Sequence, residues 1–250
     1  MQHMHSFLLL VALLIAVGAC SSDRSNPLEP SPGPNPNQPN PASSELTIDF
    51  SEFAGGDTIT STHGVTLTLA AKGETCADAL IAFDSSVPHG VALGDDFDLG
   101  TPHQAFGGPG QGRGGEEGPF RNDQPLGNLL VIQEDPALDD GNPDPQDDCV
   151  DGGTVVFDFG ELSVTGITIS SLTVLDVDDN WQAKSQFRLY GEGDQLLAIF
   201  NPPATGPNGV ATLDFGAVSG VLRMQVEERI SIAIARLLLD VPDPPGPPSG

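Results

Sequence analysis

The residues of this chain best suited to bind a ligand or to catalyse a reaction are the acids in residues 83–102, FDSSVPHGVALGDDFDLGTP. The stretch holds four aspartates and a histidine but no Lys or Arg. Carboxylates this close together repel one another, so a folded loop needs water, hydrogen bonds or a divalent ion. Asp96 and Asp98 alternate and would share one side of an extended backbone. The sequence therefore favours a cation site here over a cluster of Asx turns.

Two further acidic segments extend this hypothesis. Residues 122–183 contain fourteen acids and neither Lys nor Arg. In LDVDDN (175–180), Asp176 and Asp178 share one face at the end of an expected strand. Ca²⁺ fits such loops best, because it takes six to eight oxygen ligands in flexible geometry. For residues 135–151, which lack EF-hand spacing, a solvated acidic loop is the alternative.

A second cation site is expected where the ends of the domain meet. Asp49 and Glu52 lie on the first expected strand, and Asp240 closes the last one. Terminal strands of a jelly roll are often neighbours, so the three acids could share a structural Ca²⁺. The alternative is that they are simple surface acids.

A catalytic role for these carboxylates is a weaker hypothesis than cation binding. Two of Asp96, Asp98, Asp176 and Asp178 could serve a polysaccharide-acting hydrolase or lyase, but one of them would need a raised pKa. The chain has no GxSxG elbow, no P-loop and no paired nucleophile and base. Trp181, the single tryptophan, is either a sugar-stacking residue or a core anchor. A non-enzymatic binding protein is therefore expected.

The elements that must position these acids are almost all β-strands. Short apolar or alternating runs, among them LTIDF, ALIAF, NLLVIQE, GTVVFDF and SIAIARLLLD, are punctuated by Gly, Pro, Asn and Asp. This predicts an all-β, two-sheet, jelly-roll-like sandwich over residues 45–241. Long insertions break the rhythm at 84–125 and 134–152, and GGPGQGRGGEEGP in the first is expected to be mobile. The formal net charge of −26 excludes nucleic-acid binding.

The N-terminus predicts export and a lipid anchor. Residues 7–17 are eleven consecutive apolar residues, too few to span a bilayer, and VGAC at 17–20 resembles a bacterial lipobox. Residues 1–19 would then be a signal peptide, and Cys20 would carry lipid at the outer membrane. A plain secretory signal is the alternative. Residues 20–44 form a proline-rich linker, and 242–250 a second proline-rich tail.

Lipidation of Cys20 leaves Cys76 and Cys149, which are expected to form a disulfide in an exported domain. Such a bridge would close a loop of roughly 70 residues and contribute on the order of 4 kcal/mol.

Several segments together resemble a known domain: FDSS-P, GDDFDLGTP, GNLLVIQED, GGTVVFDF, ITISSLTVLDVDD and GVLRMQVE. They are similar to a β-sandwich domain of exported bacterial surface proteins of the PEP-CTERM or choice-of-anchor type, over about residues 46–240. The chain departs from that pattern at Val87 and in its Gly-rich insertion. If the aspartates of that family bind metal, the resemblance implies these ligands here: Asp84, Asp96, Asp98, Glu134, Asp176 and Asp178.

The sequence thus predicts a lipid-anchored, Ca²⁺-stabilised module of the cell envelope. Its expected partner is a polysaccharide or an envelope protein. The alternatives are a polysaccharide-acting enzyme and a purely structural spacer.

Overall fold

The computed structural model describes residues 43–73, 75–88, 96–135, 148–149, 151–177, 185–228 and 232–244. All of them belong to a compact unit that begins at Pro41. The predicted signal peptide and residues 20–42 of the predicted linker, Cys20 included, lie outside the described residues, as do Asp178 and Trp181, whereas the last two residues of that linker, Ser43 and Ser44, begin a strand. Within the described part, no helix is long and apolar enough to cross a membrane.

The first sheet has six antiparallel strands built around β12 (Ala233–Pro242). One edge of β12 pairs with β7, and the other is shared by β1 and, at the single pair Ile234–Leu130, by β5. The remaining strands of this sheet are β1 (Ser43–Ile48), β4 (Cys76–Asp84), β5 (Asn128–Glu134), β7 (Ile167–Leu175) and β10 (Val210–Val221).

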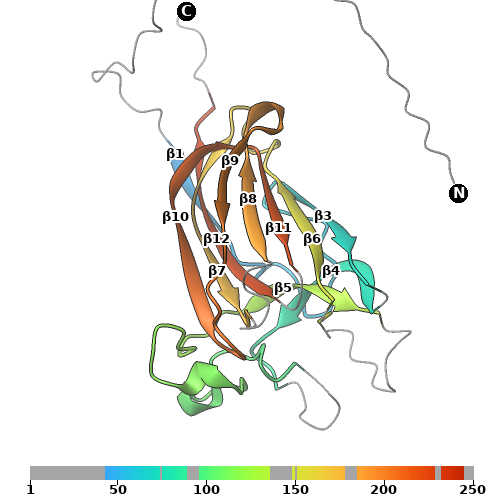
Figure 1. Cartoon of the computed structure of the whole chain (residues 1–250), viewed down its shortest axis with the longest axis vertical. Helices are drawn as coiled ribbons and strands as arrows, with labels where there is room; N and C mark the ends of the chain where they lie inside the picture. The colour runs from blue at the N-terminus through green and yellow to red at the C-terminus, as the bar shows by residue number, and fades with distance from the viewer. Residues whose placement is uncertain are drawn as a thin grey trace, which may run out of the picture. The chain divides into compact units, whose positions relative to one another are not determined.

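The second sheet also has six antiparallel strands and faces the first (Figure 1). In spatial order they are β2 (Ser61–Thr62), β3 (Val65–Ala71), β6 (Gly153–Asp158), β11 (Arg223–Glu227), β8 (Gln186–Tyr190) and β9 (Leu196–Phe200). Along β3, Val65 and Leu67 are buried whereas Thr66 and Thr68 are exposed, the period-two pattern of a half-buried strand. The predicted all-β, two-sheet sandwich is confirmed.

Strands β4 and β5 are apolar without alternation because both of their faces are buried. One face contributes Leu80, Ala82, Leu130 and Ile132 to the main core between the sheets. The other face belongs to a second cluster, which we call the outer core. It consists of Ile81, Phe83, Leu99, Leu129, Val131, Leu175, Ala233 and Ala235. Leu99 comes from the insertion between β4 and β5 (residues 85–127), so this insertion covers the part of the outer face that the outer core forms.

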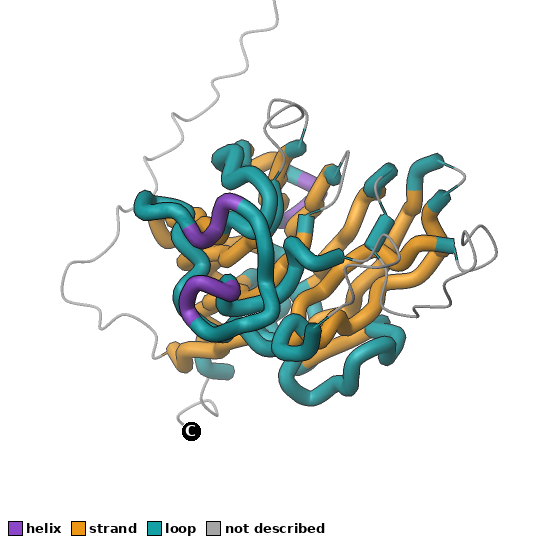
Figure 2. Tube along the Cα trace, turned by 90° about the horizontal axis from the view of Figure 1, so that it is seen from below, coloured by secondary structure: helices purple, strands orange, loops and turns teal. Residues whose placement is uncertain are grey.

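The Gly-rich part of the insertion is folded, which corrects the expectation that it is mobile. It forms two 3₁₀ turns, η1 (Gln104–Phe106) and η2 (Arg113–Gly115). Figure 2, which looks from below, shows the two turns and the loops around them in front of one group of strands, at the lower end of the sandwich in Figure 1. A Cβ atom at Gly110 would overlap the carbonyl oxygen of Gly100, and one at Gly114 would overlap that of Asn208. Glycine is therefore needed here for close backbone packing rather than for mobility.

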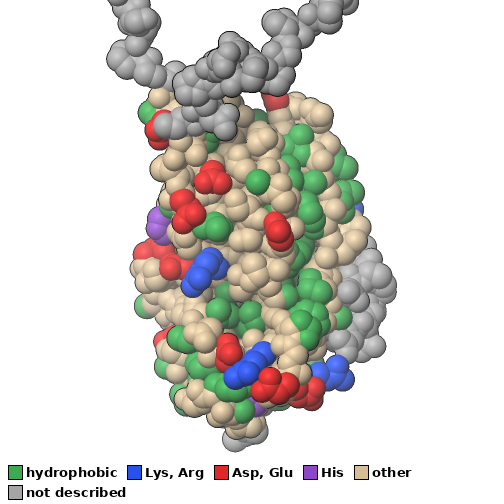
Figure 3. Space-filling view, turned by 90° about the vertical axis from the view of Figure 1, so that its left-hand side faces the viewer, with side chains coloured by type: hydrophobic (Ala, Val, Ile, Leu, Met, Phe, Trp, Pro, Cys, Tyr) green, Lys and Arg blue, Asp and Glu red, His purple; other side chains and the backbone are tan. Residues whose placement is uncertain are grey.

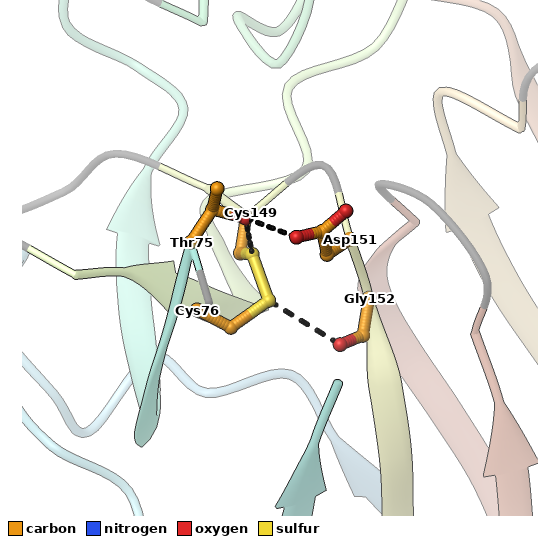
Figure 4. The surroundings of a disulfide bond; sticks show 5 residues. All are labelled: Thr75, Cys76, Cys149, Asp151 and Gly152. Atoms are coloured by element: carbon orange, nitrogen blue, oxygen red, sulfur yellow. Dashed lines mark hydrogen bonds between the residues drawn. A yellow bond between two sulfur atoms is a disulfide. The ribbon is translucent and has the colours of Figure 1, made fainter. Parts of the chain in front are cut away.

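The predicted disulfide between Cys76 and Cys149 is confirmed, with Cα atoms 5.2 Å apart (Figure 4). It joins the first residue of β4 to the segment that precedes β6. Beside it, the Thr75 hydroxyl donates a hydrogen bond of 2.6 Å to Asp151. The bridge thereby holds Asp148, the neighbour of Cys149, at one end of the sandwich.

Candidate functional site

The structure does not gather the predicted metal ligands into one centre. Asp84 accepts hydrogen bonds from the backbone N–H (3.0 Å) and hydroxyl (2.6 Å) of Ser86, which is the Asx turn that the sequence left as the alternative. Asp84 lies opposite Asn128, whereas Glu134 lies opposite Cys76 at the far end of the same strand pair. Six residues of strand separate the two levels, roughly 20 Å. Among the described residues, no three Asp, Glu, His or Cys side chains are placed to hold a metal ion.

Asp96, Asp98 and Asp176 do approach one region, where the side chains of Asp96 and Asp176 and the backbone carbonyl of Asp98 accept hydrogen bonds from other loops. Asp176 accepts a hydrogen bond of 3.1 Å from the backbone N–H of Asn208. The side-chain amide of Asn208 donates to the carbonyl oxygen of Asp98 at 2.7 Å. Asp96 accepts a bond of 2.8 Å from the backbone N–H of Asp148. These acids thus connect four loops of the domain.

The DLGTP segment that marks the family resemblance is a hub of buried hydrogen bonds. The carbonyl oxygen of Gly100 accepts from the side-chain amides of Asn122 (3.1 Å) and Asn208 (2.7 Å). Asn122 also donates to the side-chain oxygen of Asn208 at 3.0 Å. The hydroxyls of Ser85 and Thr101 are bonded to each other at 2.6 Å. All four side chains are at most 1% exposed, so the motif fastens the insertion to the sandwich.

The half-buried Asp98 and the buried Asp148 and Glu228 form what we call the buried acidic cluster, which the sequence indicates only in part. Burial and the nearby Asp148 raise the pKa of Asp98 to about 6. Burial and then Asp148 also raise the pKa of Glu228 well above its usual range, against the attraction of Lys72. Glu228 was missed although a signal existed, because it follows Met224 and Val226 in the buried phase of a period-two strand.

The second predicted cation site is dispersed along its strands. β1 and β12 are neighbours as expected, but Asp240 pairs with Glu45, while Asp49 lies one residue beyond the pair Ile48–Leu237. That offset of four residues is roughly 13 Å. Asp49 instead accepts a hydrogen bond from the N–H of Ser51 at 3.2 Å, and Glu52 bonds to the hydroxyl of Thr62.

A cleft lies where the insertion meets the outer face of the first sheet, and we call it the sheet cleft. Its floor carries Thr173 of β7, Thr212 of β10 and Arg236 of β12, which are paired across neighbouring strands. Its wall is part of the insertion, and its volume is about 240 Å³. The lining residues are Arg121, Asn122, Asp123, Gln124, Leu126, Thr173, Val210, Thr212 and Arg236.

A second cleft, the outer cleft, lies beside the same wall and has a volume of about 220 Å³. It is lined by Arg113, Glu116, Glu117, Gly118, Pro119, Phe120, Arg121, Ala204 and Thr205. Arg121 therefore lines both clefts. Its guanidinium is held by Glu117 (3.2 Å) and Asp123 (3.1 Å) and lies 4.2 Å from the centre of the Phe106 ring.

Three of the nine basic residues of this acidic chain are thus placed around two adjoining clefts. Basic and acidic side chains lie next to one another at the lower end of Figure 3, the level of the insertion in Figure 1. The sequence alone does not indicate a basic subsite, because Arg236 is far in the chain from Arg113 and Arg121 and only the fold brings it to them.

A third and larger cleft, of about 440 Å³, lies near the ends of β1 and β12. Leu162, Val164, Val241, Pro242 and Pro244 give it a largely apolar lining. Its polar lining residues are Ser44, Glu161, Ser163, Thr165 and Asp243. No Arg, Lys, His or amide side chain lines it, so the hydrogen-bond donors among its lining side chains are hydroxyls.

No protein-family model and no curated protein sequence matches this chain. Among solved structures, a partial similarity is found to a histidine mutant of the lectin binding domain of Lectinolysin, complexed with Lewis b. It covers 37% of this chain and 68% of that one, with 13% sequence identity and a TM-score of 0.27. A similarity this limited says nothing about the ligand of this chain.

Proposed function

We propose that this protein is an exported, lipid-anchored β-sandwich that binds carbohydrate in the sheet cleft. The observation that carries the proposal is the lining of that cleft, where Arg121, Asp123, Gln124, Thr173, Thr212 and Arg236 mix donors and acceptors. A sugar hydroxyl both donates and accepts hydrogen bonds, so it is best recognised by such a mixed set of fixed polar groups.

The rigidity of the cleft supports this proposal. Its floor consists of paired strands, and the hydroxyls of Thr173 and Thr212 lie 3.1 Å apart. Its wall is fixed through Asn122, which is buried and bonded to Asn208. Polar groups that are ordered before the ligand arrives lose little conformational entropy on binding.

Binding rather than hydrolysis is favoured by where the titrating carboxylates lie. A glycosidase needs a carboxylic acid of raised pKa at the bond that it cleaves. Here Asp98 and Glu228 have raised pKa values, but neither lines the sheet cleft or the outer cleft.

Export and anchoring are supported by separate features of the chain. The VGAC segment resembles a lipobox, and the disulfide between Cys76 and Cys149 suits an oxidising compartment. We expect the native chain to fractionate with membranes and a Cys20→Ser chain to be soluble. A native chain that is found only in the soluble fraction would contradict the lipid anchor.

A glycan array tests carbohydrate binding directly, using the Cys20→Ser chain for solubility. Arg236→Ala and Gln124→Ala should each weaken binding at least tenfold. The matched control is Arg223→Ala, because Arg223 lies on the second sheet with Asp194 3.0 Å away, and its loss should leave binding unchanged. An array on which no glycan binds would contradict the proposal. Release of reducing ends from a bound polysaccharide would establish the enzyme instead.

A further inference from the structure

The two clefts share a single wall, the segment from Phe120 to Gln124. Phe120 lines the outer cleft, Asn122, Asp123 and Gln124 line the sheet cleft, and Arg121 lines both. The wall is anchored on the sheet because the carbonyl oxygen of Phe120 accepts a hydrogen bond of 3.0 Å from the N–H of Val210, which itself lines the sheet cleft. The clefts therefore adjoin at the guanidinium of Arg121.

Each cleft alone is smaller than a typical ligand pocket. Their volumes of about 220 and 240 Å³ fall below the roughly 300–1,000 Å³ of sites that enclose a small molecule. Together they reach that range. A ligand that uses the whole surface must therefore be elongated and must pass Arg121, whose fixed donors can bond to it at the junction.

The charge of the lining indicates what kind of elongated ligand fits. Three arginines line the two clefts, and three carboxylates lie among them: Arg113, Arg121, Arg236, Glu116, Glu117 and Asp123. The arginine charges are thus balanced locally, while the chain as a whole carries a formal charge of −26. The net negative charge of the protein would repel an anionic polymer, and the two clefts carry no net positive charge that could offset this repulsion.

We propose that the ligand is an internal stretch of an uncharged polysaccharide, with consecutive sugar units in the outer cleft and the sheet cleft. This proposal rests on carbohydrate binding as proposed above and specifies the class of carbohydrate. A protein that recognised one terminal sugar would need a single cleft that encloses it, whereas here two open clefts meet at Arg121.

Calorimetric titration with a length series of one neutral oligosaccharide tests the inference, with the Cys20→Ser chain as the protein. Affinity should rise at least tenfold between the shortest oligosaccharide and one long enough to occupy both clefts, and then level off. Ala204→Trp should fill the outer cleft and abolish that gain while leaving binding of the shortest oligosaccharide unchanged. Thr212→Trp should abolish binding of every length.

The matched control is Thr68→Trp, the same exchange at an exposed strand threonine on the second sheet, and it should change nothing. Glu116→Trp is a second outer-cleft variant if Ala204→Trp does not fold. Affinity that is independent of length, or a preference for uronate-bearing over neutral oligosaccharides, would overturn this inference and leave carbohydrate binding intact. If neither neutral nor acidic glycans bind, the proposed function itself fails.

Discussion

At the scale of single residues, Asn208 connects segments that are far apart in the chain. Its side-chain amide donates to the carbonyl oxygens of Asp98 and Gly100, and its side-chain oxygen accepts from Asn122. Its backbone has a φ of 60°, a left-handed conformation that asparagine tolerates better than most residues. One buried side chain therefore joins the β9–β10 loop to two separate segments of the insertion, residues 98–100 and Asn122.

We expect Asn208→Ala to lower the free energy of unfolding by about 3 kcal/mol. The substitution leaves buried carbonyl and amide groups without partners, and each such group costs about 1–3 kcal/mol. Urea unfolding followed by circular dichroism measures the change. Asn201→Ala is the control, because Asn201 is exposed and accepts only a long bond of 3.5 Å from Gln186. Equal losses for the two variants would show that the hub does not stabilise the fold.

The buried acidic cluster predicts how stability depends on pH. Because the folded-state pKa of Asp98 is about 6, above its ordinary value of 3.8, the protonated form is favoured by folding. Its contribution to stability is full below about pH 4 and is lost as the pH rises through 6. We expect Asp98→Asn to raise the free energy of unfolding at pH 7.5 by on the order of 1–3 kcal/mol and to have little effect at pH 4.

Unfolding curves at pH 4 and pH 7.5 test this difference, with Asp78→Asn as an exposed control whose effect should be the same at both values. Glu228→Gln should act in the same direction as Asp98→Asn, because its pKa is also raised. If the Asp98→Asn protein is less stable than the wild type at pH 7.5, the ionised Asp98 is not destabilised by burial and by Asp148 as inferred here.

The residue types of the DLGTP segment predict a metal-binding loop, although the segment forms a hydrogen-bonded turn. Aspartates in a Gly-bracketed turn suit both a cation site and a hydrogen-bonded turn, and the distinction depends on the partners. The partners of Gly100 are 22 and 108 residues away, so local spacing does not reveal them. The burial of Glu228 is different, because the alternating pattern of β11 in the sequence already predicts that this residue lies on the buried face.

At the scale of elements, the strands were predictable because their sequence periods are local. For example, GEGD at 191–194 separates two apolar runs, which is a local hairpin signal, and β8 and β9 do pair. The insertion was not predictable in the same way, because its glycines were read as a sign of mobility. The continuous apolar runs of β4 and β5 do indicate that the insertion is folded. Strands that are apolar on both faces need a layer that covers the second face, and here the insertion supplies it.

That covering layer predicts a difference between two glycines of the insertion. A Cβ at Gly110 would overlap backbone and the Asn208 side chain, whereas Gly107 has open space around it and only its φ of 87° disfavours alanine. We expect Gly110→Ala to cost about 2–3 kcal/mol through overpacking, and Gly107→Ala about 1 kcal/mol through backbone strain. Guanidinium unfolding measures both. If the two alanines cost the same, close packing does not explain the glycines.

At the scale of the whole molecule, charge is the dominant property. The chain has 35 acidic and 9 basic residues, and the described acids form hydrogen bonds and buried contacts instead of a three-ligand metal centre. Calcium binding therefore stays a prediction of the sequence. A bound calcium ion would act most strongly at Asp98 and Glu228, because burial and the nearby Asp148 raise the pKa of each of these two acids.

We expect millimolar calcium chloride to raise the melting temperature at pH 7.5 and EDTA to reverse the rise. A divalent ion relieves the repulsion among the buried carboxylates, and extracellular calcium modules bind the ion with dissociation constants on the order of 10⁻⁴–10⁻³ M. Sodium chloride at matched ionic strength separates ion binding from screening, because screening acts on all 35 acids alike. Asp98→Asn should reduce the calcium-specific part of the rise, while Asp78→Asn should preserve it. If the melting temperature responds equally to both salts, or to neither, the protein does not bind calcium specifically. Its many acidic residues would then serve solubility alone.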